Sequence, residues 1–203
     1  RRALGAKQGQ ALLPLARLQR DLGGTPEERL VARAPCGVEH QLHRGGRLAA
    51  HSTVDLINHG AIGTAAQLMG LGTAMLDMSV AYAGQRKQYG KLIGEYQGLK
   101  HQLADVAIAL EMARPLLWAG ALAIAENPGD PGAAVRDVSA ARVAVADAAY
   151  LSARTALQVH GAIGYTQEHD LGLWLTKIRA LQTAWGTQSY HRGRVLESLG
   201  SAR

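Results

Sequence analysis

The chain has 203 residues, of which 47% are hydrophobic, so it is long enough to bury a core without disulfides or metal ions. Its formal charge of +6 is concentrated in residues 1–49, where nine Lys and Arg accompany four Asp and Glu; the rest of the chain carries thirteen and twelve. A basic stretch of this size is most often a solvated surface, and the balanced remainder argues against nucleic-acid binding.

Cysteine usage and hydropathy narrow the class of protein further. Cys36 is the only cysteine, which excludes an internal disulfide and a cysteine-based zinc site, and we expect no metal site. No run of eighteen apolar residues is present, and the first residues lack the apolar core of a signal peptide. We therefore expect a cytoplasmic protein with no membrane insertion.

Residues 1–49 form a first region with mixed signals. Glycine and proline pairs interrupt it, and residues 29–33 could form a short strand between these breaks. We expect a short irregular or β-containing segment, too short to be a complete second domain, followed by a helical domain over residues 50–203.

The pattern becomes helical from about Ser52. Residues 64–85 are apolar and rich in alanine, although glycines at positions 70 and 72 weaken the pattern. Apolar residues then recur at steps of four and three from Leu99 to Leu117, which predicts a helix with one apolar stripe. Pro115 lies in that stripe and predicts either a kink or the weak end of the helix.

The second half of the chain predicts one more long helix and two shorter ones. Residues 127–132 are the clearest linker, after which apolar residues spaced by seven indicate a helix to about His160. Shorter helices are expected near 169–181 and 188–199. Ten of the residues from 133 to 156 are alanine and the chain has no Phe, which favours closely spaced helices. The sequence thus predicts an all-α, antiparallel helical bundle.

Three clusters of polar residues and glycines stand out from this helical background: 82–97, 158–168 and 185–189. Arg86 in the first cluster could clamp a phosphate, or it could cap the end of a helix. Gly161 and Gly164 in the second could let backbone amides approach a ligand, or they could simply end a helix. Taken singly, no cluster establishes a function.

Together, in this order and spacing, the clusters resemble the acyl-CoA dehydrogenase family over roughly residues 60–199. The family's Y-A-x-x-R-x-Q-F-G is present with Tyr89 in place of Phe, and its Q-x-x-G-G-x-G-Y with Ala162 in place of the second Gly. Its final E-G-T corresponds to Trp185-Gly186-Thr187. The resemblance implies the family's C-terminal helical bundle and its reaction, the FAD-dependent α,β-desaturation of an acyl-CoA thioester.

In that family, FAD lies on one subunit and is completed by the helical bundle of a neighbouring subunit. The resemblance implies that this chain contributes eight residues to a neighbour's FAD: Arg86, Gln88, Tyr89, Gln97, Gln158, Gly161, Ala162 and Gly164. Thr187 would contact a flavin bound on its own subunit. Ser189 stands where the family often has Gln, which weakens that last assignment.

The general base of the reaction is missing from both positions at which the family places it. Most members have Glu where this chain has Trp185, whose indole cannot accept a proton. Other members place it on the preceding helix, and counting back twenty-two residues from Tyr82 gives Gly60. Asp55 and His59 lie nearby and could substitute, although such residues are more often caps or surface positions. Trp185 itself could pack in the core or fill the acyl pocket.

The resemblance also suggests how the chain would act. Family members carry two domains before the bundle, which 49 residues cannot supply, while the contacts to a neighbour's flavin are retained. This asymmetry resembles the non-catalytic subunit of heteromeric actinobacterial acyl-CoA dehydrogenases, some of which act on steroid side-chain thioesters. We expect a homo- or hetero-oligomer, a tetramer with a full-length relative, that shares its FAD and serves fatty-acid or steroid degradation. A truncated self-sufficient dehydrogenase and a helical interaction module without a cofactor remain alternatives.

Overall fold

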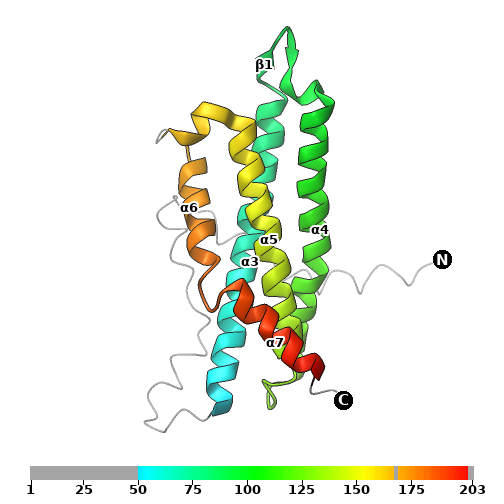
Figure 1. Ribbon diagram of the computed structural model, residues 1–203, viewed down its shortest axis with the longest axis vertical. Coiled ribbons are helices and arrows are strands. Elements are labelled where there is room, and N and C mark those ends of the chain that lie inside the picture. Colours follow the sequence, from blue (N-terminus) through cyan, green and yellow to red (C-terminus); the bar gives the residue numbers. More distant parts are fainter. Residues whose placement is uncertain (1–49, 167–168, 201–203) are drawn as a thin grey trace, which may run out of the picture. The chain divides into compact units, whose positions relative to one another are not determined.

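The computed structural model describes residues 50–166 and 169–200, which form a helical bundle (Figure 1). The N-terminal segment, with the strand predicted at 29–33, lies outside these residues. The described part contains three long helices and two short ones: α3 (Ala50–Ala83), α4 (Gln97–Glu126), α5 (Val135–His160), α6 (Leu171–Leu181) and α7 (Gln188–Gly200). The predicted all-α bundle is confirmed.

Helix α5 is the centre of the bundle, because it packs against each of the other four helices. Its buried face consists mostly of alanine and valine, which lets neighbouring backbones approach closely. A Cβ at Gly72 of α3 would lie 3.2 Å from the Cα of Ala149 and 2.9 Å from the Cδ2 of Leu110. The hydroxyl of Ser152 donates to the carbonyl of Gly72 at 2.7 Å. Packing therefore explains a glycine that weakens the helical pattern in the sequence.

Pro115 does not end helix α4, so the expectation of a weak helix end there is wrong. The helix continues eleven residues past it, to Glu126. Proline removes one N–H from the helical ladder, but buried residues on both sides of it, among them Leu110 and Ala123, fix the helix against the core. Tertiary packing here outweighs the local cost of the proline.

A short hairpin joins α3 to α4 and was not predicted. Strands β1 (Lys87–Gln88) and β2 (Lys91–Leu92) pair antiparallel, and a 3₁₀ turn, η2 (Ile93–Glu95), follows. The two residues between the strands, Tyr89 and Gly90, both have positive φ, +50° and +81°. This is the backbone geometry that two-residue hairpin turns need.

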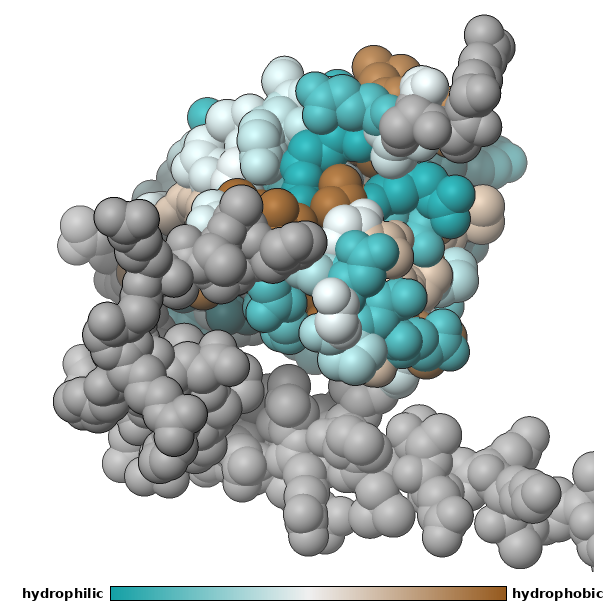
Figure 2. Space-filling model, turned by 90° about the horizontal axis from the view of Figure 1, so that it is seen from below, coloured by the Kyte–Doolittle hydropathy of each residue, from teal (hydrophilic) through white to brown (hydrophobic). Residues whose placement is uncertain are grey.

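The two ends of the bundle gather different segments. Figure 1 places the hairpin and the 3₁₀ turn η3 (Gly161–Tyr165) at the upper end, with α7 and the α4–α5 linker at the lower end. The linker was predicted at 127–132. A side chain within it stabilises its turn, since Asp130 Oδ1 accepts the N–H of Gly132 at 3.0 Å. Figure 2 looks onto the lower end, where hydrophilic residues surround scattered hydrophobic ones.

Candidate functional site

The upper end of the bundle presents the first cluster on an exposed hairpin and on the ends of the two helices that flank it. The side chains of Arg86, Gln88, Tyr89 and Gln97 are all exposed. Arg86 makes no side-chain hydrogen bond or ion pair with the part of the chain that the structure describes. Its backbone N–H donates to the carbonyl of Tyr82 at 2.9 Å, so the helix end is closed by the main chain. The guanidinium is therefore not used as a helix cap.

The hairpin that carries these residues is anchored at its base. The hydroxyl of Tyr96 donates to the carbonyl of Gln88 at 3.1 Å, and the Lys91 Nζ lies 4.1 Å from the centre of the Tyr96 ring. The N–H of Ile93 donates to the carbonyl of Arg86 at 2.8 Å. Positive charge is thus held at a defined position beyond the end of the bundle, which suits an anionic ligand such as a diphosphate.

The second cluster lies at the same end, where α5 stops. Gln158 and Ala162 are exposed, and Gly161 has a φ of +61°, which only glycine adopts without strain. Gly164 is buried, and a Cβ there would lie 2.8 Å from the Cδ2 of Leu171. The fold itself therefore requires these two glycines, and the residues between them, Ala162 and Ile163, are exposed.

Three neighbouring rings, a stacked pair and a third ring tilted by 58° from it, join the two clusters. The rings of Tyr82 and His160 are stacked with their centroids 4.5 Å apart, and the ring of His169 lies 4.9 Å from that of His160. His160 Nδ1 donates to the carbonyl of Ala156 at 2.8 Å, which leaves the buried Nε2 without a partner among the described residues. Burial first, and then the neighbouring His169, lower the pKa of His160. The stack fixes the end of α3 against the end of α5.

The third cluster lies at the opposite end of the bundle. Trp185 and Gly186 form a turn in which both residues have positive φ, +59° and +115°. The hydroxyl of Thr187 accepts the N–H of Tyr190 at 3.3 Å, and its carbonyl accepts the N–H of His191 at 3.1 Å. Thr187 thus begins helix α7 in the manner of an N-cap residue.

Trp185 lies directly against Gly60. A Cβ at Gly60 would fall 2.2–2.6 Å from three adjacent indole atoms, Cδ2, Cε2 and Cε3. Because these three atoms are nearly equidistant, the indole presents a face to the backbone of α3. The two positions at which the resemblance places a general base are therefore in contact, and neither holds a carboxylate. Twenty-two residues of helix separate Gly60 from Tyr82, or about 33 Å.

Buried polar residues that were not predicted from the sequence form a hydrogen-bond network with the turn at Trp185 and Gly186. His191 Nε2 donates to the carbonyl of Trp185 at 3.1 Å, so its Nδ1 is the acceptor for the Ser139 hydroxyl at 3.3 Å. Arg194 donates to Ser139 at 3.3 Å and to Asn58 Oδ1 at 2.8 Å. The only sign of this network in the sequence is His191 and Arg194, spaced three apart on one face of a short helix.

A second buried arginine lies close to the same turn. Arg142 Nη2 donates to the carbonyls of Leu181 and Ala184, while its Nε and Nη1 have no partner among the described residues. The burial of His191, and then the charge of Arg142, lower the pKa of His191 to about 4. The hydrogen bond of His191 to the Trp185 carbonyl acts in the opposite direction. His191 is therefore neutral at physiological pH.

The two substitute bases considered from the sequence pair with one another. His59 Nδ1 lies 3.1 Å from Asp55 Oδ1 and 2.9 Å from the Asp55 carbonyl, and about half of each side chain is exposed. Residues 50–166 and 169–200 contain no group of three or more His, Cys, Asp or Glu arranged to hold a metal ion.

Comparisons with known proteins agree on one family. The family model for the acyl-CoA dehydrogenase C-terminal domain matches residues 50–200. A 3-sulfinopropanoyl-CoA desulfinase of Paraburkholderia xenovorans is 34% identical over 138 residues, covering 68% of this chain and 34% of that protein. A mitochondrial short-chain specific acyl-CoA dehydrogenase of Sus scrofa is 32% identical over 156 residues, covering 75% of this chain and 36% of that protein. The chain spans about a third of the length of these curated relatives.

A solved structure has the same fold. The ChsE4-ChsE5 complex of Mycobacterium tuberculosis matches with a TM-score of 0.69 and 26% identity, over 75% of this chain and 40% of that one. One curated relative is named as a desulfinase and the other as a dehydrogenase, so likeness to the family does not by itself fix the reaction.

Proposed function

The chain belongs to the acyl-CoA dehydrogenase family, and on this premise we propose that its bundle completes the FAD site of a partner subunit. The oligomer so formed would desaturate an acyl-CoA thioester between its α and β carbons, in the cytoplasm. The observation that carries this proposal is the Arg86 guanidinium, which is exposed, unpaired within the described chain and held beyond the bundle by an anchored hairpin. A surface arginine with no partner of its own is free to form paired hydrogen bonds to phosphate oxygens.

The neighbouring residues fit the rest of the same cofactor. The exposed amides of Gln88, Gln97 and Gln158 can donate to and accept from the hydroxyls and adenine of a dinucleotide. Tyr89 offers an exposed ring on the hairpin tip, and Ala162 and Ile163 are exposed on the η3 turn. FAD, when bound, supplies the ring that accepts the hydride. The residues of this chain bind and orient the FAD that the partner subunit carries.

Among the described residues, neither position at which the family places the group that removes the α proton holds a carboxylate. A carboxylate is needed there, and positions 185 and 60 hold an indole and a glycine that pack on each other. Asp55 and His59 are exposed and already paired. We therefore assign proton abstraction to the partner subunit.

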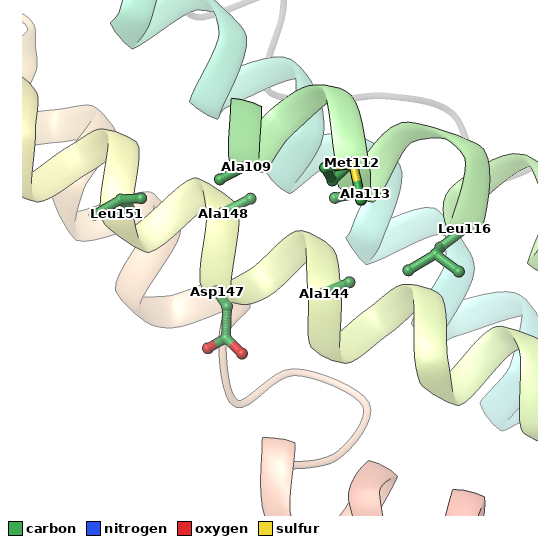
Figure 3. Close-up of a pocket in the computed structure, with 8 residues that line it drawn as sticks. All are labelled: Ala109, Met112, Ala113, Leu116, Ala144, Asp147, Ala148 and Leu151. Carbon is green, nitrogen blue, oxygen red and sulfur yellow. The ribbon is translucent and has the colours of Figure 1, made fainter. Parts of the chain in front are cut away.

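The outer face of α4 supports association with a partner. It is the only helix among the described residues long and apolar enough to cross a membrane, by length and composition, yet only 22% of its most apolar window is buried. A groove of about 300 Å³ lies between α4 and α5, with Met112 and Leu116 on one side and Leu151 on the other (Figure 3). Its floor is mostly alanine, which leaves room for a large side chain of a second helix. Partner subunits, rather than lipid, would cover this face.

Replacing Arg86 tests the cofactor role. Arg86→Ala, in the chain purified together with a full-length acyl-CoA dehydrogenase partner, is expected to weaken FAD binding roughly tenfold or more, because charged hydrogen bonds contribute about 1.5–3 kcal/mol. Arg86→Lys keeps the charge but loses the paired hydrogen-bond geometry. Its FAD affinity should lie between those of the native chain and Arg86→Ala. Bound flavin is measured by absorbance after gel filtration, and affinity by titration of the apoprotein.

Arg136→Ala is the matched control. Arg136 is an exposed arginine at the far end of α5, paired with Asp137, and its loss should leave FAD affinity unchanged. Unaltered FAD binding by Arg86→Ala would instead favour a helical interaction module without a cofactor role. FAD binding and full turnover without any partner would favour a self-sufficient dehydrogenase of which this chain is one part.

A further inference from the structure

His160 lies between the two clusters at the upper end of the bundle, where helices α3 and α5 end close together (Figure 1). It is the last residue of α5, and its ring is stacked on that of Tyr82, with the two planes inclined by 26°. The carbonyl of Tyr82 accepts the backbone N–H groups of Gln85 and Arg86 at 3.0 and 2.9 Å. A single ring contact therefore links the end of α5 to the backbone that positions Arg86.

The turn after α5 is packed back onto the same histidine. A Cβ at Gly164 would lie 3.4 Å from the Cβ of His160. On another side, the ring of His169 lies 4.9 Å away, and its Nδ1 accepts the N–H of Leu171 at 3.2 Å, at the start of α6. Displacing the ring of His160 would therefore disturb the η3 turn and the end of α3 together.

The surroundings of His160 suit only its neutral form. The residue is 4% exposed; its Nδ1 donates to the Ala156 carbonyl, and its buried Nε2 has no partner among the described residues. Burial has the largest effect and lowers the pKa of His160, against the opposing effect of the bond to Ala156, and His169 lowers it further. A proton on Nε2 would be a buried donor without an acceptor, which is costly.

The elements around His160 bring no carboxylate to balance a positive charge on it. The titratable groups in contact with its ring are Tyr82 from α3 and His169 from the segment before α6. The only titratable side chain of η3 is that of Tyr165, which is 76% exposed. Asp170, at the start of α6, is exposed and forms no hydrogen bond or ion pair with His160. A charged His160 would therefore leave this position.

We infer that neutral His160 is a positioning residue that holds the two clusters together as one flavin-completing site, and that protonation of its Nε2 separates them. The inference rests on the proposed function for the identity of the ligand, and it adds a condition under which the site is assembled. FAD affinity should be constant above about pH 6.5, the ordinary pKa of histidine, and should fall below it.

The direction of this pH dependence is diagnostic. A positive charge added at this end would by itself tighten the binding of an anionic diphosphate as the pH falls. Separation of Arg86 from the η3 turn has the opposite effect, because the two no longer meet the same cofactor. Weaker binding in acid thus indicates loss of the arrangement, and tighter binding indicates a simple effect of charge.

FAD titration of the chain in complex with a full-length partner, from pH 8 to pH 5, measures this dependence. Native affinity should fall roughly threefold or more between pH 7 and pH 5. His160→Phe keeps a ring against Tyr82 but cannot titrate, so its affinity should be near the native value at pH 7.5 and remain constant to pH 5. His101→Phe removes an exposed histidine of α4 and should follow the native profile. The histidines of the partner subunit are the same in all three complexes.

A second measurement needs no cofactor. In the purified chain, NMR follows the titration of His160, and the backbone amide signals of Arg86 and Gly164 should shift with the same midpoint. These shifts should be absent in His160→Phe. A flat FAD profile, tighter binding in acid, the same fall in His160→Phe, or amide signals that do not follow His160 would each overturn the inference. Unaltered FAD affinity in Arg86→Ala bears instead on the proposed function, and the NMR test does not depend on it.

Discussion

His191 shows how one buried side chain couples the lower turn to pH. It has no exposed surface, donates to the Trp185 carbonyl and accepts from the Ser139 hydroxyl, so its neutral form satisfies both partners. A second proton would place a donor against a position that now accepts, beside the charge of Arg142. The folded state therefore resists protonation of His191, whereas the unfolded chain does not.

This difference predicts acid destabilisation in a defined window. The pKa of His191 is about 4 in the folded chain and near 6.5 when unfolded, so the unfolded state binds more protons between these values. The free energy of unfolding should fall as pH decreases from about 6.5 to 4, by up to about 3 kcal/mol. Chemical denaturation at a series of pH values measures it.

The variant His191→Gln is the control for that prediction. Glutamine can keep one donor and one acceptor but does not titrate, so the difference in unfolding free energy between native and variant should shrink or reverse below pH 5. Other groups, including His160, titrate in both proteins and cancel in the difference. Parallel curves for the two proteins would show that His191 does not set this dependence.

At this scale the sequence identified the exposed polar residues but not the buried network. Arg86, Gln88 and Gln97 lie within one short segment, so their spacing alone placed them together. The bonds of Arg194 to Asn58 and of His191 to Ser139 join positions 136 and 52 residues apart. No local pattern encodes such contacts, because they depend on how three helices cross.

Helix α3 contains two glycines, two residues apart, that should respond oppositely to alanine. No atom lies within 4 Å of the position that a methyl at Gly70 would take, so Gly70→Ala should raise the free energy of unfolding by about 0.5–1 kcal/mol. At Gly72 the methyl would press on the Ala149 backbone and on Leu110, so Gly72→Ala should lower it by about 1–3 kcal/mol. Thermal or urea unfolding measures both.

The pair of substitutions controls for helix propensity, which is the same at the two positions. Stabilisation by both alanines would mean that α3 and α5 can separate slightly without cost. In that case the small residues on α5 would not be set by close approach of the two backbones.

At the scale of elements, the long helices were predictable and the hairpin was not. The apolar stripe from Leu99 to Leu117 extends over several helical turns. Its packing against the core stabilises the helix by more than Pro115 destabilises it. Strands of two residues are too short for any periodic signal. The remaining sign of the hairpin was the dipeptide Tyr89-Gly90, whose glycine suits a turn with positive φ.

At the scale of the whole molecule, the outer face of α4 should mediate association. Met112 is 70% exposed and borders the groove between α4 and α5. A carboxylate placed there would be buried without a partner on assembly, so Met112→Glu should weaken association with the partner subunit at least tenfold. Analytical ultracentrifugation of the mixed subunits measures the change.

Leu173→Glu provides the matched control. Leu173 is 71% exposed on α6, so the change in polarity is similar but lies outside the groove. Assembly should be unaffected by it. Equal loss of assembly in both variants, or in neither, would argue against α4 as the contact surface.

Gly60 and Tyr82 belong to one uninterrupted helix, and this restricts which insertions and deletions the sequence can accept during evolution. Inserting or deleting a single residue between them would turn one end by about 100° relative to the other. Either the indole of Trp185 would lose its glycine or the Tyr82 ring would leave His160. Substitutions along this stretch can accumulate while its length stays constant, so alignments of related chains should be free of gaps between these two positions.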